Sequence, residues 1–245
     1  MHLNLILLRR MRMRINPITP NPALISIIKD SSQIITLDAN FLIPPSRSGY
    51  NRKGIGFKQF KEIWLDPIFI AFPHLAIHEA VYDELVGTAP QSFINNNRDC
   101  DPPKIIIHSD STLTEVEKIL RDSIEARIAY HTNYEPLQNN KDDRGEVKSL
   151  SYIAVKGLLY FAANDNNAIQ LIEKSELWST GLDNVQAIKI HELLYYLCKI
   201  QLRNMTAMKM LYKYLYYLTE REKSINPNWG DYFSKMEKLY ESYFK

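Results

Sequence analysis

Acidic residues occur in four separate short patterns whose residue types suit a divalent metal ion. The first pattern is an apolar run over residues 33–38 that ends in Asp38 and is followed two residues later by Asn40. An acid at the carboxyl end of an early parallel strand lies where α/β proteins place their chemistry. The other three patterns carry Glu84, the pair Asp143 and Glu146, and Asp165.

Carboxylate oxygens are the ligands that Mg²⁺ and Mn²⁺ prefer, together with water and substrate phosphate. Carboxylates that crowd together repel one another, and a bound cation relieves that repulsion. One or two such ions can make water nucleophilic and stabilise the leaving oxygen of a phosphodiester. Taken singly, each acid has an ordinary explanation as a turn residue, a surface acid or a partner of a helix dipole. The four patterns together favour a metal site.

The elements that must position these acids follow from apolar periodicity and from turn residues. We predict strands at 33–38, 68–72, 75–77, 104–108 and 158–162, with one more at 177–179. Helices are expected at 57–66, 78–85, 112–134, 145–157 and 167–175, and Thr112 with Glu115 predicts a capping box. Residues 15–24, 44–56, 87–103 and 135–142 are expected to be extended or loop segments, and the chain beyond 183 is expected to be all helical.

Strands that alternate with helices predict an α/β sandwich with a central parallel sheet, followed by a helical C-terminal part. The predicted divisions are a basic arm or linker at 1–32, an α/β domain that carries the acidic patterns at 33–182 and a helical extension at 183–245. Tyrosines at helical spacing in that extension are interpreted first as core packing, with a base-stacking surface as the alternative.

These motifs resemble the PIN-domain family of metal-dependent nucleases over about residues 33–180. The carrying patterns are Asp-Ala-Asn at Asp38, Val-Tyr-Asp-Glu-Leu at 81–85, Asp-Arg-Gly-Glu at 143–146, and Ala-Asn-Asp ending at Asp165. One departure is Ala163, which stands where the family usually has Thr or Ser. The resemblance implies a PIN-like α/β/α sandwich and an active endoribonuclease that uses Mg²⁺ or Mn²⁺.

Carried over residue by residue, the resemblance implies catalytic and metal-binding roles for four acids. Asp143 would be a fifth acid of the metal site, which either ligates a second ion or supports the direct ligands. Asn40 would orient Asp38 or contact a phosphate. The basic loop after Asp38 supplies candidate phosphate contacts, and a solvated loop is their ordinary explanation. The four acids are Asp38, Glu84, Glu146 and Asp165, and the loop residues are Arg47, Arg52 and Lys53.

Charge and composition narrow the classes of ligand and cofactor that the sequence permits. Residues 1–61 carry ten Lys or Arg and two acids, and residues 186–245 carry ten and six, so the middle is strongly negative at a formal net charge of +2. An acidic centre between basic ends suits a metal site that acts on a polyanion, although ordinary variation in surface charge explains it equally well. No G-x-G-x-x-G dinucleotide motif and no zinc-ligand spacing of histidines occur. Two distant cysteines and the lack of a long apolar run predict a cytoplasmic, reducing location without a membrane span.

The sequence therefore predicts a metal-dependent endonuclease acting on single-stranded RNA, with DNA as a further substrate class. Many proteins of the family are toxins of toxin–antitoxin pairs or RNA-processing enzymes. The alternatives are a non-catalytic binding module and a DNA-directed defence nuclease. The C-terminal helices are expected to form a homo-oligomer interface, or to bind an antitoxin or another protein, or to clamp the substrate.

Overall fold

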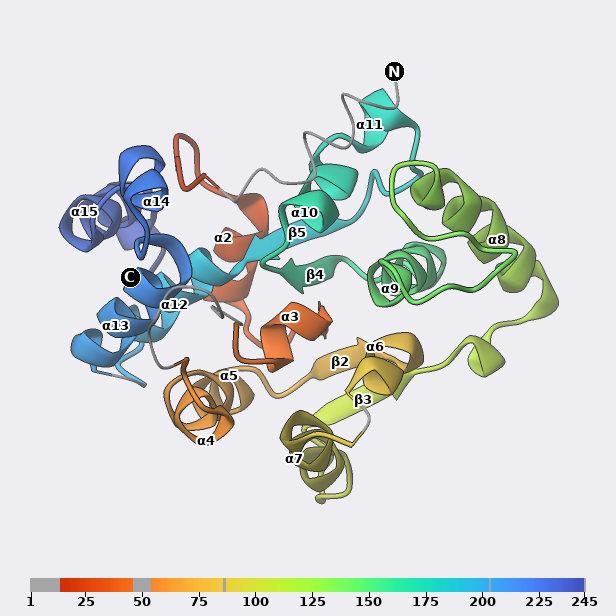
Figure 1. Cartoon of the computed structure of the whole chain (residues 1–245), viewed down its shortest axis with the longest axis horizontal. Coiled ribbons are helices and arrows are strands. Elements are labelled where there is room, and N and C mark those ends of the chain that lie inside the picture. The colour runs from red at the N-terminus through yellow and green to blue at the C-terminus, as the bar shows by residue number, and fades with distance from the viewer. Residues whose placement is uncertain (1–13, 46–53, 86, 203, 245) are drawn as a thin grey trace. The chain divides into compact units, whose positions relative to one another are not determined.

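A five-stranded parallel sheet flanked by helices forms the centre of the protein, and this confirms the predicted α/β class (Figure 1). The computed structural model describes residues 14–45, 54–85, 87–202 and 204–244. The strand order is β3-β2-β1-β4-β5. The strands are β1 (Ile35–Leu37), β2 (Leu75–His78), β3 (Ile105–His108), β4 (Tyr160–Ala163) and β5 (Gln186–Lys189).

The strand order places β1 at the centre of the sheet. The chain adds β2 and β3 on one side of β1, and β4 and β5 on the other side. Ile35 pairs in parallel with Leu75 of β2 on one side and with Tyr160 of β4 on the other. Ligand sites of open α/β sheets lie outside the carboxyl ends of the strands at such a switch point. Asp38 directly follows β1, and Asp165 follows β4 by two residues. The topology therefore brings the first and the last predicted acids to neighbouring strand ends.

The chain forms two compact units, which are described separately. The first unit includes Ile34–Ile43 and His74–Ala187, and the second includes Arg12–Gln33, Pro44–Pro73 and Ile188–Lys245. This grouping by spatial contact is discontinuous in the sequence. The divisions expected at residues 33 and 183 stay a prediction.

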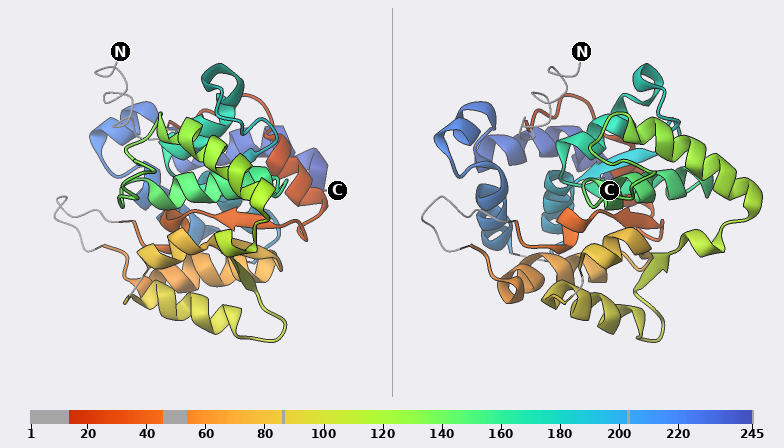
Figure 2. Two further views of the ribbon diagram at one scale, coloured as in Figure 1. Left: turned by 90° about the vertical axis from the view of Figure 1, so that its right-hand side faces the viewer. Right: turned by 45° about the vertical axis from the view of Figure 1, so that its right-hand side comes forward.

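In the first unit, α9 is the helix that connects the sheet to the outer layer. It packs against β2, α6 and α8, and the two views of Figure 2 agree that α8 runs along α9. The capping box that opens α8 is formed by Thr114 and Glu117, two residues beyond the predicted pair. The helices of this unit are α3 (Ala39–Leu42), α6 (Glu79–Glu84), α7 (Ala89–Arg98), α8 (Glu115–Ala129), α9 (Arg144–Val155), α10 (Asn166–Glu173) and α11 (Ser175–Trp178).

The second unit is built around tyrosines of its C-terminal helices. The rings of Tyr212 and Tyr232 stack with centroids 4.5 Å apart, and Tyr195 and Tyr240 are fully buried beside them. These positions agree with core packing, whereas Tyr214, Tyr217 and Tyr243 stay partly exposed. The helices are α2 (Pro22–Lys29), α4 (Phe57–Phe60), α5 (Asp66–Ala71), α12 (Ile190–Lys199), α13 (Met205–Tyr216), α14 (Glu220–Ile225) and α15 (Trp229–Tyr240), with a π-helical turn at Lys61–Leu65.

Several predicted elements are wrong, and proline explains two of them. Residues 87–103 contain α7, because Thr88 caps the helix and Pro90 lies in its first turn, where a missing N–H costs nothing. Pro22 likewise opens α2 inside the segment expected to be extended, with Asn21 as the N-cap.

Short apolar runs account for the other errors. Residues 68–72 are mostly helical, and 177–179 belong to the end of α11 and not to a strand. Such runs do not distinguish a buried helix from a strand. The last strand, β5, begins at Gln186 inside the region expected to be all helical. Within the described ranges, no helix combines the length and the apolar character that crossing a bilayer requires.

A buried histidine in the second unit makes folding sensitive to acid. His191 packs edge-on against Tyr216 and Tyr232, and burial, with a smaller effect of the Lys189 charge, lowers its pKa to about 3. His191 of the unfolded chain therefore takes up a proton near pH 6.5, whereas His191 of the folded chain stays neutral there. The free energy of unfolding is consequently largest above pH 6.5 and falls as the pH drops below it.

We expect wild type to lose about 1.4 kcal/mol of unfolding free energy per pH unit more than His191→Phe between pH 6 and 4. Urea unfolding at several pH values measures this difference. His74→Phe, at an exposed position, is the control and should parallel the wild type. Parallel curves for His191→Phe and wild type would contradict the assignment.

Candidate metal centre

Asp38 lies at the centre of the carboxyl edge of the sheet. Its backbone N–H donates to the carbonyl of Ala162 in β4 at 3.0 Å, which continues the β1–β4 pairing to the acid. Its side chain is 4% exposed and makes no helix-capping hydrogen bond, although Asp38 precedes α3. The Asn40 amide donates to Asp38 Oδ2 at 3.0 Å. The carboxylate is thus oriented by Asn40 and is not used to cap the helix.

Glu84 reaches the same region from the last residue of α6. Its Oε1 accepts the backbone N–H of Gly145 at 3.0 Å. A Cβ placed on Gly145 would lie 2.5 Å from that oxygen and 3.1 Å from Val81 Cγ2. Only glycine therefore permits this approach between α6 and the first turn of α9.

The first turn of α9 contributes the two acids of the third pattern. Asp143 has a left-handed backbone with φ of 54°, and its Oδ2 accepts the N–H of Asn133 at 2.8 Å. Glu146 is 8% exposed and accepts from the side-chain amide of Asn167 at 3.3 Å. The guanidinium of Arg144, which lies between these two acids in the sequence, is 3.5 Å from the exposed carboxylate of Asp83.

Asp165 is the N-cap of α10. Its Oδ1 accepts the backbone N–H of Asn167 at 2.6 Å, and the side chain of the same Asn167 donates to Glu146. Asn167 therefore links the fourth acid to the third. Sequence reasoning missed Asn167, and the signal that could have found it is its position two residues after an acid, as in an Asx turn.

Burial and mutual repulsion raise the pKa values of four of these acids. Burial raises the pKa of Asp38 to about 7, with further contributions from the charges of Asp165 and Glu84. The pKa of Glu146 lies well above its ordinary range, because of burial and then the charges of Asp165, Asp38 and Asp143. Burial likewise raises the pKa of Asp165, with the Asn167 N–H acting in the opposite direction.

Glu84 belongs to the same electrostatic group. Although the residue keeps contact with solvent, partial burial of its carboxyl group raises its pKa, against the effect of the Gly145 N–H and Arg144. The charge of Asp143 acts on Glu84, Glu146 and Asp165. Segments that are far apart in the sequence are thus brought within electrostatic range of one another, and their donor set is the one that hard divalent cations prefer.

The five carboxylates are near neighbours, but no three of them place oxygen atoms within 4.8 Å of one another, as the direct ligands of one metal ion would. Among the described residues, the one group with three ligand atoms within 4.8 Å of one another is His78, Glu79 and Asp110. Of the predicted phosphate contacts, Arg47, Arg52 and Lys53 lie outside the described residues, so those assignments stay predictions.

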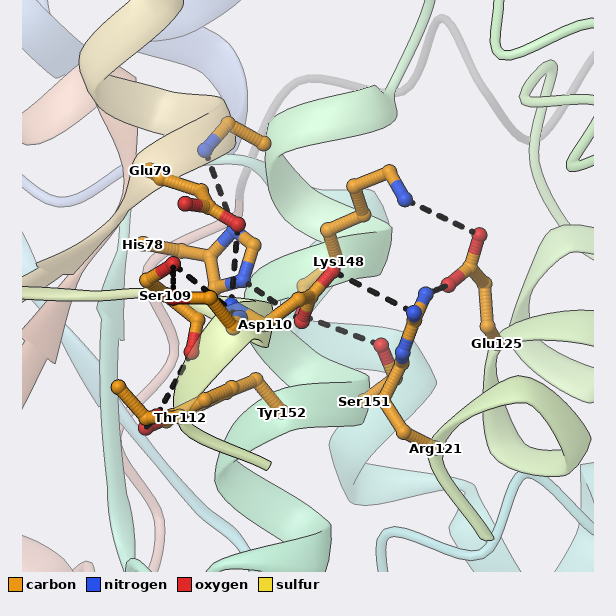
Figure 3. Close-up of polar contacts among 12 residues, drawn as sticks. His78, Glu79, Ser109, Asp110, Thr112, Arg121, Glu125, Lys148, Ser151 and Tyr152 are labelled. Atoms are coloured by element: carbon orange, nitrogen blue, oxygen red, sulfur yellow. Dashed lines mark hydrogen bonds and ion pairs between the residues drawn. The ribbon is translucent and has the colours of Figure 1, made fainter. Parts of the chain in front are cut away.

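The group His78, Glu79 and Asp110 joins the ends of β2 and β3 (Figure 3). Its spacing could hold a metal ion, yet each of the three side chains already makes a hydrogen bond or an ion pair. His78 Nδ1 accepts the N–H of Ala80 at 3.1 Å, so the ring proton is on Nε2, which faces Asp110 Oδ1 at 3.3 Å. Glu79 accepts the N–H of Asp110 at 2.9 Å. A cation at His78 would have to displace a proton or turn a fully buried ring.

Positive charges balance this second group. Arg121 lies 3.4 Å from Asp110 and also bonds Glu125, which Lys148 approaches to 3.5 Å (Figure 3). Burial alone would raise the pKa of Asp110, but His78 and the two cations lower it overall. The arrangement supports a structural polar network. Sequence spacing could not reveal it, because Asp110 is separated from His78 by 31 intervening residues.

Comparisons with known proteins add no further constraint. No protein-family model, curated protein or solved structure matches the chain.

Gly145→Ala should separate Glu84 from the other acids while leaving the fold intact. The added methyl group displaces the flexible Glu84 carboxylate, and the better helix propensity of alanine offsets part of the cost. We expect Mn²⁺ affinity, measured by titration calorimetry, to fall by about tenfold. Gly56→Ala is the control, because a Cβ there meets nothing within 4 Å. Unchanged Mn²⁺ affinity in Gly145→Ala would exclude Glu84 from the ion site.

Asp38→Asn should stabilise the ion-free protein at neutral pH. Because the folded pKa is about 7, the folded state holds a proton that the unfolded state releases, so wild-type stability falls as pH rises from about 4 to 7. The asparagine lacks this loss, and we expect a gain on the order of 3 kcal/mol at pH 7.5 in EDTA. Unfolding by urea at pH 5 and 7.5 measures it, with exposed Asp142→Asn as the control. A variant less stable than wild type at pH 7.5 would contradict the raised pKa of Asp38.

Proposed function

We propose that this protein is a metal-dependent nuclease with a PIN-like fold that hydrolyses phosphodiester bonds, most readily in single-stranded RNA. The observation that carries the proposal is the electrostatic coupling of Asp38, Glu84, Glu146 and Asp165 at the carboxyl edge of a parallel sheet. Perturbed pKa values in one cluster are a mark of functional sites. The order of the four sequence patterns supports the same assignment.

The donor set fits Mg²⁺ or Mn²⁺, since it offers carboxylate oxygens without a cysteine or a free histidine nitrogen. In this proposal Asp38, Glu84, Glu146 and Asp165 hold the ion or ions, and Asp143 adds negative charge at the edge. A bound divalent ion would supply charge neutralisation for the phosphate and a more acidic water.

The surrounding residues then act by positioning. Asn40 holds one oxygen of Asp38, the Gly145 N–H holds Glu84, and Asn167 holds both Glu146 and Asp165. Raised pKa values mean that the ion-free site retains protons near neutral pH, and these must leave when a cation binds. Ion affinity, and activity with it, is therefore expected to rise with pH through about 7.

Glu146→Gln and Asp165→Asn should each abolish cleavage without unfolding the protein. We expect a rate loss of about 100-fold or more, the size typical of removing an electrostatic group that acts on a transition state. The assay uses a labelled mixed-sequence single-stranded RNA and the matching DNA, each with Mn²⁺, Mg²⁺ or EDTA. Asp142→Asn, a neighbouring exposed acid, is the matched control and should cleave like wild type.

Three outcomes of this assay decide between the alternatives. Cutting of RNA that needs a metal ion and Glu146 supports the proposal, and faster cutting of DNA would redirect it to a DNA-directed nuclease. Full activity in both variants would contradict the site. A folded wild type that cuts neither strand with either ion would favour a non-catalytic binding module.

A further inference from the structure

We propose that Tyr130 stacks against an unpaired nucleobase of the substrate strand beside the carboxylate cluster. The inference deepens the proposed function and rests on it for the identity of the ligand as single-stranded nucleic acid. It assigns a residue outside the acidic motifs, at the carboxyl end of α8, a base-binding role.

Tyr130 belongs to a small cluster of rings on the surface of the first unit. Its side chain is 75% exposed, and it meets the ring of His131 edge-on at 5.2 Å. His131 in turn stacks on Trp178 of α11, with centroids 4.9 Å apart and planes 13° apart. The His131 Nε2–H donates to the backbone carbonyl of Trp178 at 3.2 Å, which fixes the ring. Lys174 lies over the Trp178 ring at 4.9 Å. Because His131 and Trp178 stack on each other, each has one ring face covered. The exposed Tyr130 is the ring of this cluster that can present a face to a base.

The turn that carries Tyr130 is closed by hydrogen bonds and leads directly to Asp143. Thr132 hydrogen-bonds the carbonyl of Ala129 through both its N–H and its hydroxyl, and the hydroxyl also accepts the N–H of Tyr134. One residue before Tyr134, the Asn133 N–H donates to Asp143 Oδ2 at 2.8 Å. Three residues span at most about 11 Å, so Tyr130 lies within that distance of an atom bound to the acidic cluster. Even stacked nucleotides advance about 3.4 Å each, so only a few nucleotides separate the two places.

The charges near the rings favour base stacking over phosphate contact. Arg127 and Lys174 supply two positive charges, since the Arg127 guanidinium borders the turn at Gly181 and Lys174 covers Trp178. Glu173 and Glu176 in the same segment supply two negative charges. The patch therefore has little net attraction for phosphate, and the ring itself must provide the affinity. Base–aromatic stacking is sequence-tolerant and strong enough to do so.

Three tyrosines of the C-terminal helices do not offer an equivalent surface, because their rings are buried. Tyr195, Tyr212 and Tyr240 are each at most 1% exposed and serve the core of the second unit. A stacking residue must present a face to solvent. This contrast separates Tyr130 from most of the tyrosines that sequence spacing brings to attention.

The test measures how much a bound base contributes with and without the Tyr130 ring. In the Glu146→Gln background, which prevents cutting, fluorescence anisotropy compares a labelled 12-nucleotide oligouridylate with a 12-unit abasic ribose-phosphate chain. We expect the oligouridylate to bind at least about tenfold more tightly, and Tyr130→Ala to reduce that ratio about fivefold or more. Tyr130→Phe keeps the ring and should keep the ratio. Leu137→Ala changes a fully exposed apolar side chain outside the ring cluster and should also keep it.

The outcomes separate this inference from the proposed nuclease. A ratio that is the same with and without Tyr130, in proteins with equal melting temperatures, overturns the stacking role even if wild type cleaves RNA. A parent protein that binds both chains equally overturns it as well. Tyr130-dependent discrimination in a protein that never cleaves would support the stacking site and overturn the nuclease.

Discussion

The burial of carboxylates beside one another is the constraint on which the candidate site of the first unit depends. Asp38, Glu146 and Asp165 are held close together by β1, α9 and the end of β4, and each raises or responds to the charge of another. Water cannot screen them well, because two of the three are almost fully buried. The rest of the fold must therefore be stable enough to hold these groups together, and in the proposed function a bound cation would offset this cost.

The first unit contains two groups of acidic residues, and they differ in how their negative charge is balanced. Around Asp110 the protein provides Arg121, Lys148 and a histidine proton, so the charges are balanced within the chain. Around Glu146 the partners that the structure describes are an amide and other acids. Spacing alone favours the Asp110 group as a metal site, whereas hydrogen bonding and charge favour the Glu146 group. Bonding is the better guide here, because a ligand atom already committed to a donor must lose that donor before it can bind an ion.

Helix α9 connects the two groups and sets their separation. Asp143 is its N-cap, Glu146 lies in its first turn, and Lys148, two residues later, approaches Glu125 of α8 to 3.5 Å. The close approach at Gly145 brings α6 against this turn, so Glu84 joins the acids only because no side chain intervenes. The hydrogen bond from the Asn133 backbone N–H to Asp143 Oδ2 ties the loop after α8 to the start of α9.

The sequence by itself determined the strand-end positions of Asp38 and Asp165, the alternation of strands and helices, and the acidic opening of α9, because these depend on local periodicity and on turn residues. It could not determine α7, whose Pro90 suits a helix start as well as a loop, or β5, which is a strand only because β4 offers it a partner. Tertiary structure alone decided that Gly145 must lack a side chain, that Asn167 joins two acids, and that the Asp110 group is balanced by Arg121. The contacts of Gly145 with Glu84, of Asn167 with Glu146 and of Asp110 with Arg121 join residues on different elements, and local patterns carry no information about such distances.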